Sequence, residues 1–527
     1  MKIESTTLRT FTTVHTWVGL VAGFALFVAF YAGAITVFHH ELMLWQAPHA
    51  ASKPAGTLDD AQRLLDETLE RHPASRQWVG MLFPGAESPQ PVIYWPDEKA
   101  VWHYATLDNL QGSDKPPQAG LSELVNALHF SLGIPVAGTY LMGVVSLLYG
   151  VALLSGLLIH LPSLLKDLFA LRPGRNLKRF WQDAHNVIGV LSLPMHLMFA
   201  ITGAMLCLVM VAAVALNPLI YDGKVMEAIG PAMDTAPVIA PAGEPAPQGT
   251  LAFWQQRAQS AAQAQGISEF EPAYLKLLHA GDRNATVEIT GESPRSLGPL
   301  GSVALNAGTG EILATQLPGH RDANHATLAS AYALHFGEYA NVWVRWLYFV
   351  LGVGGAFLFY SGNLLWIESR RKRRQVQQGR AQIGMAKATV GVCLGVCVAI
   401  SLAFVAATLL EARALSQVGL NVDAGIQWVC FLSWTLCALW AVIRPVAKAT
   451  RELLWAAALA TAAVPIAHGA ATGWWWWTSA MNGQWVLFGI DATALAMAFG
   501  FALLARASRR RALHGDPHSV WAEPARA

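Results

Sequence analysis

Long apolar runs dominate the chain, and polar segments of two lengths separate them. Eight of these runs approach or exceed the roughly 20 residues that an α-helix needs to cross a bilayer. The pattern therefore predicts an α-helical integral membrane protein with about 8 transmembrane helices. The runs are residues 14–38, 133–161, 185–216, 341–367, 386–410, 424–444, 452–472 and 485–506.

Lys and Arg gather in every second linker between these runs. They are frequent after the second, fourth and sixth runs and in the tail, whereas 411–423 holds only Arg413 and 473–484 holds neither. Because cytoplasmic loops carry the excess of basic residues, both termini are expected in the cytoplasm. The run of tryptophans from Trp474 to Trp477 then falls at the outer interface, where indole rings anchor helices.

The two long polar segments, about 40–130 and 217–337, are then expected on the outer side of the membrane. The first begins with TLDDAQRLLDETLERH, which predicts a capped amphipathic helix, and continues with strand-like pieces such as PVIYWP and AVWHYATL. The second repeats this order with LAFWQQRAQSAAQAQG, NATVEITGE and SVALNAGTGEILATQ. Each segment is therefore expected to form a small α+β module.

Composition agrees with a membrane protein and excludes other classes. With 54% hydrophobic and 13% charged residues, the chain is too apolar for a water-soluble globule of 527 residues. A net charge of +2 gives no reason to expect a nucleic-acid partner. The five cysteines lie in apolar runs without a C-x-x-C-H motif, so neither disulfides nor covalently attached haem is expected. The first apolar run lacks a convincing cleavage site and is interpreted as a retained helix.

An internal duplication relates the first four runs. His15 and His185 are each followed by Gly at +4 and +18, and His129 and His335 are each followed by Ser-Gly at +26 and +27. The two copies share one orientation, which predicts a pseudo-twofold axis along the membrane normal. The expected parts are a first repeat 10–161, a cytoplasmic loop 162–184, a second repeat 185–367, a basic loop 368–385, four additional helices 386–506 and a tail 507–527.

The duplication turns four single histidines into two pairs. The axis would bring His15 to His185 near the cytoplasmic side and His129 to His335 near the outer side. Ionisable residues in spans are costly and usually functional. Two facing imidazoles can hold a metal, and a bis-histidine haem suits this setting because the porphyrin is broad and apolar. The alternatives are histidines bonded to backbone carbonyls or helix ends, and zinc, which usually recruits more ligands.

Glycine supports the haem interpretation. Gly19, Gly133 and Gly189 stand four residues after His15, His129 and His185, on the same helical face. A residue without a side chain at that position leaves room for a flat ring close to the helix.

Two further histidines are lesser candidates for haem ligands. His196 lies on the face of His185 and has no counterpart in the first repeat, where Leu26 stands. It could ligate the outer haem, bridge the two haems, or pack with its ring bonded to a backbone carbonyl. His40 lies on the face of His15 at the outer end of the first run, and could ligate or be interfacial.

These motifs resemble a known family. HTWVGLVAGF, LHFSLG…YGVALLSGLL, DAHNVIGVLSLPMHLMFAITG and LHFGEYANVWVRWLYFVLG…YSGNLLWIESRRKRR are similar to the PepSY-associated transmembrane family, and turns such as LNAGTGEIL resemble its PepSY modules. The resemblance covers roughly residues 10–375. Residues 386–527 lie beyond it, and what they add is open.

The resemblance implies an iron–siderophore reductase of a bacterial inner membrane. Such a protein carries two b haems, is embedded in the lipid bilayer, and passes electrons from a cytoplasmic reductase or a quinol to a ferric siderophore in the periplasm. The family's histidine motifs match His15, His129, His185 and His335 as iron ligands, and no catalytic side chain is needed. Two alternatives remain: a binding or regulatory protein that uses its outer modules, and a transporter.

Overall fold

The computed structural model describes residues 4–523 with internal gaps, and the chain divides into two compact units. Unit 1 comprises Met1–Pro48, Ala119–Val209 and Trp346–Ala527, and unit 2 comprises His49–Gln118 and Met210–Arg345. The internal residues outside the description are 49–54, 86–87, 115–119, 162–176, 226, 228–229, 231–233, 294–295, 338, 372–374, 376–377 and 413–420.

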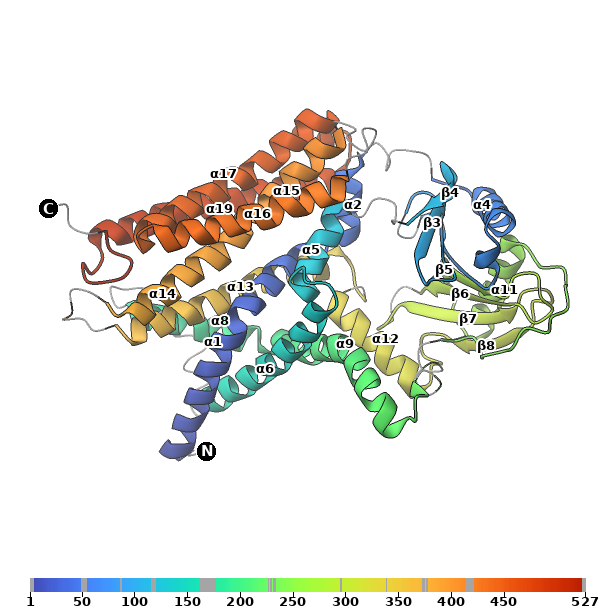
Figure 1. The fold of residues 1–527 in the computed structure, drawn as a ribbon, viewed down its shortest axis with the longest axis horizontal. Helices are drawn as coiled ribbons and strands as arrows, with labels where there is room; N and C mark the ends of the chain where they lie inside the picture. Colours follow the sequence, from blue (N-terminus) through green and yellow to red (C-terminus); the bar gives the residue numbers. More distant parts are fainter. Residues whose placement is uncertain are drawn as a thin grey trace. The chain divides into compact units, whose positions relative to one another are not determined.

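The predicted membrane spans are confirmed as helices. Among the described residues, seven helices are long and apolar enough to cross a membrane, and a bent pair brings the number to eight if it forms one span. The chain is therefore a multi-pass membrane protein (Figure 1). The spans are α1 (Ser5–Thr36), α6 (Ala137–His160), α13 (Val342–Ser369), α14 (Arg380–Thr389) continued by α15 (Gly395–Ala412), α16 (Val422–Ile443), α17 (Val446–Thr472) and α19 (Trp485–His514).

The third predicted span is bent instead of straight. It consists of α8 (Leu177–Leu191) and α9 (Leu193–Ile220), whose axes differ by 70° across Ser192. Pro194 is the second residue of α9, directly after Leu193. Proline lacks an N–H group and its ring clashes with the carbonyl four residues earlier, which favours a break at this point. The bend separates the part of the span that carries His185 from the part that carries His196.

Three candidate histidines lie on short helices beside the spans. His129 lies on α5 (Gly120–Ser131), which precedes α6, and His335 lies on α12 (Ala323–Phe336), which precedes α13. His40 lies on α2 (His39–Gln46), because α1 ends at Thr36. The two repeats thus share a pattern in which a short histidine-bearing helix leads into a long span.

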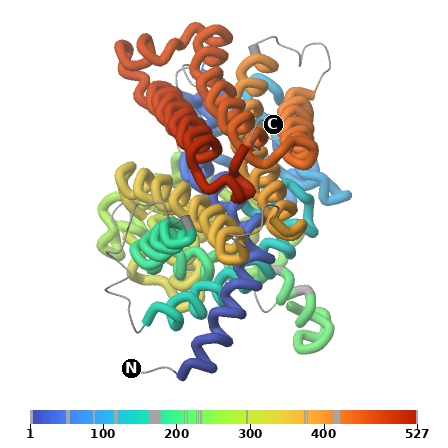
Figure 2. The backbone as a smooth tube through the Cα atoms, turned by 90° about the vertical axis from the view of Figure 1, so that its left-hand side faces the viewer, coloured from blue at the N-terminus to red at the C-terminus, as the bar shows by residue number. Residues whose placement is uncertain are grey.

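The four additional helices pack against the first repeat. Tyr31 of α1, Trp45 of α2 and Leu128 of α5 belong to the same buried cluster as Cys397 of α15 and Ile426 of α16. Figure 2 shows α15, α16, α17 and α19 in orange and red running side by side. All five cysteines are free thiols. The extension is therefore integrated into the helical core of unit 1.

The two α+β modules are present as predicted, but they share one sheet. In unit 2, α4 (Leu58–Arg71) and α11 (Leu251–Ala264) are capped by Thr57 and Thr250, and both pack on one face of the sheet. Strands β1 and β5 pair antiparallel across the module boundary. The order is β4-β3-β2-β1-β5-β6-β7-β8, with β1 (Trp78–Leu82), β2 (Val92–Pro96), β3 (Trp102–Thr106), β4 (Asn109–Ser113), β5 (Glu271–Leu278), β6 (Thr286–Glu292), β7 (Leu300–Asn306) and β8 (Ile312–Gln316).

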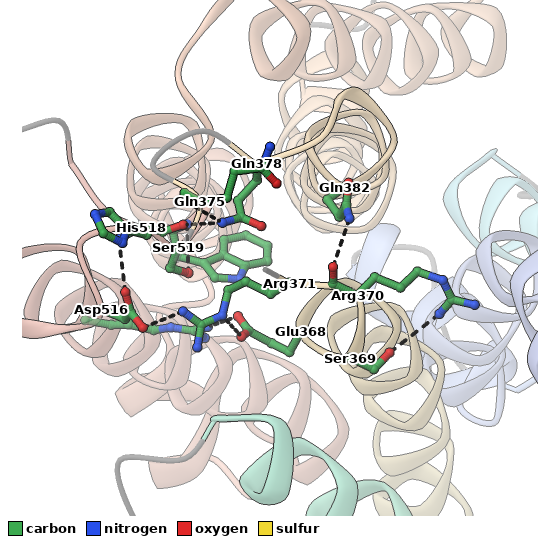
Figure 3. A network of polar contacts seen from close by, with 12 residues as sticks. Glu368, Ser369, Arg370, Arg371, Gln375, Gln378, Gln382, Asp516, His518 and Ser519 are labelled. Atoms are coloured by element: carbon green, nitrogen blue, oxygen red, sulfur yellow. Dashed lines mark hydrogen bonds and ion pairs between the residues drawn. The ribbon is translucent and has the colours of Figure 1, made fainter. Parts of the chain in front are cut away.

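A buried carboxylate ties the end of α13 to the C-terminal tail (Figure 3). Glu368, whose side chain is 1% exposed, forms ion pairs of 3.0 Å with Arg371 and with Arg511. Arg371 also pairs with Asp516 at 2.5 Å. Arg511 lies 5.4 Å from the ring of Trp521, which is itself buried. The tail is therefore held against the helix bundle by a network of charged groups.

Replacing Glu368 by alanine is expected to destabilise unit 1 by about 3–5 kcal/mol, because two partly buried arginines would lose their counter-charge. The matched control is Glu452→Ala, which removes an ion pair with Arg444 whose side chains are 30% and 37% exposed. Such an exposed pair is worth about 1 kcal/mol or less. Unfolding of the purified variants in mixed micelles measures both values, and equal losses would contradict the buried network.

Candidate functional site

His15 and His185 face each other inside unit 1. Their ring centroids are 6.1 Å apart, with an angle of 79° between the ring planes. His15 comes from α1 and His185 from α8, the helices that the duplication relates. The predicted meeting of these two side chains is therefore present in the structure.

Each ring is held by the same backbone arrangement. Nδ1 of His15 lies 2.8 Å from the carbonyl oxygen of Ala152, and Nδ1 of His185 lies 3.1 Å from that of Leu358. A carbonyl only accepts, so each Nδ1 carries the proton and donates it. The lone pair then sits on Nε2, the nitrogen left for a ligand. Ser155 and Ser361 add hydroxyl contacts to the two rings at 3.5 and 3.2 Å.

The Ser-Gly motifs explain how the rings approach the neighbouring helices. A Cβ atom on Gly156 would lie 3.0 Å from Cε1 of His15, and one on Gly362 would lie 3.3 Å from Cε1 of His185. Any larger side chain would push the imidazole away from its carbonyl partner. In the sequence these motifs are visible only as markers of the repeat, and their spacing after His129 and His335 gives no sign that they support His15 and His185.

A cavity opens beside the two rings. Its volume is about 420 Å³, within the range of about 300–1,000 Å³ typical of cofactor sites. Its lining is mostly apolar and includes both histidines, Tyr149 and Phe359. Two exposed basic residues, Lys178 and Arg370, also border it. The cavity thus combines apolar walls with positive charge.

Two of the three predicted clearance glycines border this cavity. Gly19 and Gly189 both line it. A Cβ on Gly19 would meet no atom within 4 Å, and one on Gly189 would meet only Leu358 at 3.6 Å. The open space beside these helices therefore lies where a flat ligand between the histidines would need it.

Replacing Gly19 by leucine is expected to fill this space and abolish binding of a cofactor between His15 and His185. The matched control is Gly150→Leu, because a Cβ on Gly150 also meets no atom within 4 Å but Gly150 does not line the cavity. Haem content of the purified protein should fall from about two to about one per chain in the first variant only. Equal haem content in both variants would refute the role of Gly19.

The donor set fits a haem better than a bare metal ion. Among the described residues, no group of three or more His, Cys, Asp or Glu side chains could hold a metal ion. A metal held by two histidines must therefore bring its other ligands with it, as a porphyrin does. The rings of His15 and His185, with centroids 6.1 Å apart, lie close enough for one metal-bearing group to be held by both.

His129 is positioned in the same manner. Its Nδ1 lies 2.8 Å from the carbonyl oxygen of Ala29, and a Cβ on Gly33 would lie 2.5 Å from that nitrogen. Gly33 stands at +18 after His15, and Gly203 stands at +18 after His185 in the second repeat. His335 belongs to unit 2, so the pairing of His129 with His335 stays a prediction.

The predicted role of Gly133 is wrong. Helix α5 ends at Ser131, so Gly133 does not share a helical face with His129. Gly133 has a φ of +72°, and a Cβ there would lie 2.5 Å from the ring of Phe431. Glycine is needed at this position because the backbone adopts a positive φ after the end of the helix and because Phe431 packs closely against it, and not because a ligand needs clearance.

The two lesser candidates differ from the main histidines. His196 is 1% exposed, and its Nδ1 bonds the hydroxyl of Tyr149 and not a backbone carbonyl. Within the described residues, its Nε2 has no hydrogen-bond partner. His40 is partly buried, and its Nδ1 also lacks a partner among them. Neither histidine lines the cavity, so neither joins the pair of His15 and His185.

A second buried polar group lies in the additional helices. His468 and Asp491 are both fully buried, with Nδ1 of His468 3.0 Å from one carboxylate oxygen. The indole of Trp45 donates to the other oxygen at 2.9 Å and stacks on His468 with centroids 4.6 Å apart. No local motif marks this pair in the sequence, because His468 and Asp491 lie 23 positions apart on different helices.

Comparisons with known proteins agree with the resemblance noted from the motifs. The model of the family described as the PepSY-associated TM region matches residues 12–369. The uncharacterized protein PA4219 of Pseudomonas aeruginosa is similar, with 27% identity over 360 residues, which is 66% of this chain and 86% of that protein. The match ends at the last residue of α13, so it leaves out the additional helices α14 to α19.

Proposed function

Since the chain belongs to the PepSY-associated transmembrane family, we propose that it is a di-haem b reductase of a bacterial inner membrane, which passes electrons outward to a ferric siderophore in the periplasm. The observation that carries this proposal is the pair of imidazoles, His15 and His185, 6.1 Å apart in an apolar cavity with both Nδ1 atoms bonded to carbonyls. His15 and His185 would hold the inner haem through their Nε2 atoms. His129 and His335 would hold the outer haem.

The surroundings of the inner pair support an acidic, flat cofactor. A b haem carries two carboxylates, and the exposed Lys178 and Arg370 at the cavity offer them positive charge. Arg370 is oriented by its contact with the ring of Trp366, 4.3 Å from the centroid. Gly19 and Gly189 leave the apolar faces of the helices open to the ring.

When bound, the haems supply one-electron chemistry, and the chain supplies ligation, orientation and exclusion of water. The carbonyls of Ala152 and Leu358 hold the protons of Nδ1 and so keep both Nε2 atoms available as ligands. The apolar walls of the cavity would exclude water from the bound group. Delivery of one electron to a ferric siderophore converts Fe(III) to Fe(II), for which the hard oxygen ligands of the chelator are weaker, and iron leaves.

The orientation is part of the proposal. Excess Lys and Arg in alternate linkers supports cytoplasmic termini, which puts His15 and His185 near the cytoplasm and unit 2 in the periplasm. A cytoplasmic reductase or a quinol would then act on the side of His15 and His185, and the ferric chelate on the side of His129 and His335.

The visible spectrum of the purified protein tests the proposal. We expect the bands of a reduced low-spin b haem at about two haems per chain, and their loss on addition of a ferric siderophore under anaerobic conditions. A colourless, folded protein would exclude the reductase and leave a membrane protein with a binding or regulatory role. A coloured protein whose reduced bands persist with ferric chelates would exclude siderophore as the electron acceptor.

A further inference from the structure

One face of the sheet in unit 2 carries a cluster of aromatic side chains. The helices α4 and α11 pack on the other face, against residues such as Val79, Ile93 and Leu277. Successive residues of a strand point to opposite faces of the sheet. The strand residues that alternate with Val79, Ile93 and Leu277 therefore point away from the helices. On the first half of the sheet, these residues are Trp78, Tyr94, Trp102 and Tyr104, which we call the aromatic platform.

The rings of the platform contact one another. The centroid of Trp78 is 5.6 Å from that of Tyr94 and 5.3 Å from that of Trp102. Tyr94 and Tyr104 are stacked at 6.2 Å. Trp102 is 43% exposed, whereas Trp95, on the helix-covered face, is 3% exposed. The platform is therefore a surface and not part of the hydrophobic core.

Glycine sets the shape of the platform. Gly80 lies opposite Tyr94 in the neighbouring strand, and a Cβ there would lie 2.4 Å from Cζ of Tyr94 and 2.8 Å from its hydroxyl oxygen. The phenol ring therefore lies across the strand at Gly80, over the space that a side chain would fill. On its other side Gly80 pairs with Lys276 of β5, so the platform extends to the strand that joins the two modules.

A charged cluster borders the platform at Lys276. Its ammonium group lies 2.7 Å from Asp234 and 2.8 Å from Glu288. Burial opposes the charge of Lys276, but the two carboxylates outweigh it and hold the pKa of Lys276 above its ordinary value. Glu288 also lies 3.3 Å from the backbone N–H groups of Thr235 and Ala236. With one ammonium and two carboxylates, the cluster carries a net negative charge at neutral pH.

Aromatic faces and a net negative border select ligands by charge. The π face of a Trp or Tyr ring is negative and attracts cations, with about 0.5–2 kcal/mol per contact. An anion would be repelled by the ring faces and by the excess carboxylate. Lys276 would not attract it, because its ammonium group already pairs with two carboxylates. The surface therefore suits a neutral or positively charged molecule that presents an apolar or cationic group to the rings.

We propose that the aromatic platform binds the iron chelate, and that it selects neutral or positively charged chelates over polyanionic ones. The identification of the ligand as an iron chelate rests on the proposed function. The charge preference rests on the platform and on the cluster of Lys276, Asp234 and Glu288.

Gallium chelates test binding separately from reduction, because Ga(III) has the charge and size of Fe(III) and is not reduced to a stable divalent ion. Titration calorimetry with the full-length protein would compare a Ga(III) trihydroxamate that bears a free ammonium group with a Ga(III) tris-catecholate, which is triply negative. We expect the first to bind and the second to bind at least about tenfold more weakly. Equal or tighter binding of the anionic chelate, or no binding of either, would overturn the proposal.

Three variants locate the binding surface. Trp102→Ala should weaken binding of the cationic chelate about tenfold. Asp234 is exposed, and Asp234→Asn makes the cluster neutral. This variant should bind the cationic chelate more weakly and the anionic chelate more tightly. Glu244→Gln removes an exposed carboxylate paired with Arg283 outside the cluster and should change neither affinity. Wild-type affinities in Trp102→Ala and Asp234→Asn would overturn the platform.

The outcomes also separate the platform from the reductase. A coloured protein that reduces ferric chelate with the same KM in wild type and Trp102→Ala would keep the reductase and reject the platform. A colourless protein that binds the gallium chelate through Trp102 would keep the platform as a ligand site and reject the reductase.

Discussion

Replacement of His185 by alanine is expected to remove one haem per chain and leave the other. The ring of His185 lies 6.1 Å from that of His15, and a haem iron between them would lose one of two axial ligands. His15→Ala should have the same result. Haem content should fall from about two to about one per chain, and the remaining spectrum should be that of a low-spin bis-histidine haem. His129→Ala and His335→Ala should remove the other haem.

His160→Ala is the matched control for His185→Ala. His160 also lines the cavity, at the C-terminal end of α6, and is not one of the four histidines that the duplication pairs. It should retain about two haems per chain. Imidazole added to His185→Ala should restore the inner haem, because the cavity left by the side chain accepts the free ring. Unchanged haem content in His15→Ala and His185→Ala would contradict the assignment of the inner site.

The sequence predicted the helices and the inner pair because both depend on local or repeated patterns. Apolar runs of sufficient length determine spans, and the spacing of Gly19 after His15 and of Gly189 after His185 revealed the duplication. A twofold relation between two helices would bring together equivalent residues that face the axis. The rings of His15 and His185 do lie 6.1 Å apart, as that prediction requires.

Features that depend on packing between distant segments were not predicted. The joining of β1 to β5 is an edge-to-edge pairing of two modules, and the amphipathic pattern of each strand is the same whether or not its edge is covered. The carbonyls of Ala152 and Leu358 have no sequence signature, because every residue carries a carbonyl. Gly133 was misassigned because the spacing of four residues implied a continuous helix, whereas α5 ends two residues before it.

Replacement of Asp491 by alanine is expected to destabilise the additional helices without removing haem. The carboxylate accepts from Trp45 and His468, and all three side chains are fully buried. Without it, two buried N–H groups lose their acceptor, at about 1–3 kcal/mol each. We expect a loss of about 3–5 kcal/mol in unfolding free energy, measured in mixed micelles. The folded fraction should keep about two haems per chain, because Asp491 does not line the cavity.

A double replacement distinguishes a structural lock from a site with its own chemistry. Asp491→Asn keeps one acceptor oxygen and should lose less stability than Asp491→Ala. Asp491→Leu combined with His468→Phe replaces both partners by apolar side chains and should recover part of the loss, since a buried polar pair is often no more stable than its apolar substitute. Trp45 lies on α2 of the first repeat, so the same group links the repeat to α17 and α19, which lie outside the family match. Full recovery of stability with loss of electron transfer to the chelate would show that the pair acts in the reaction.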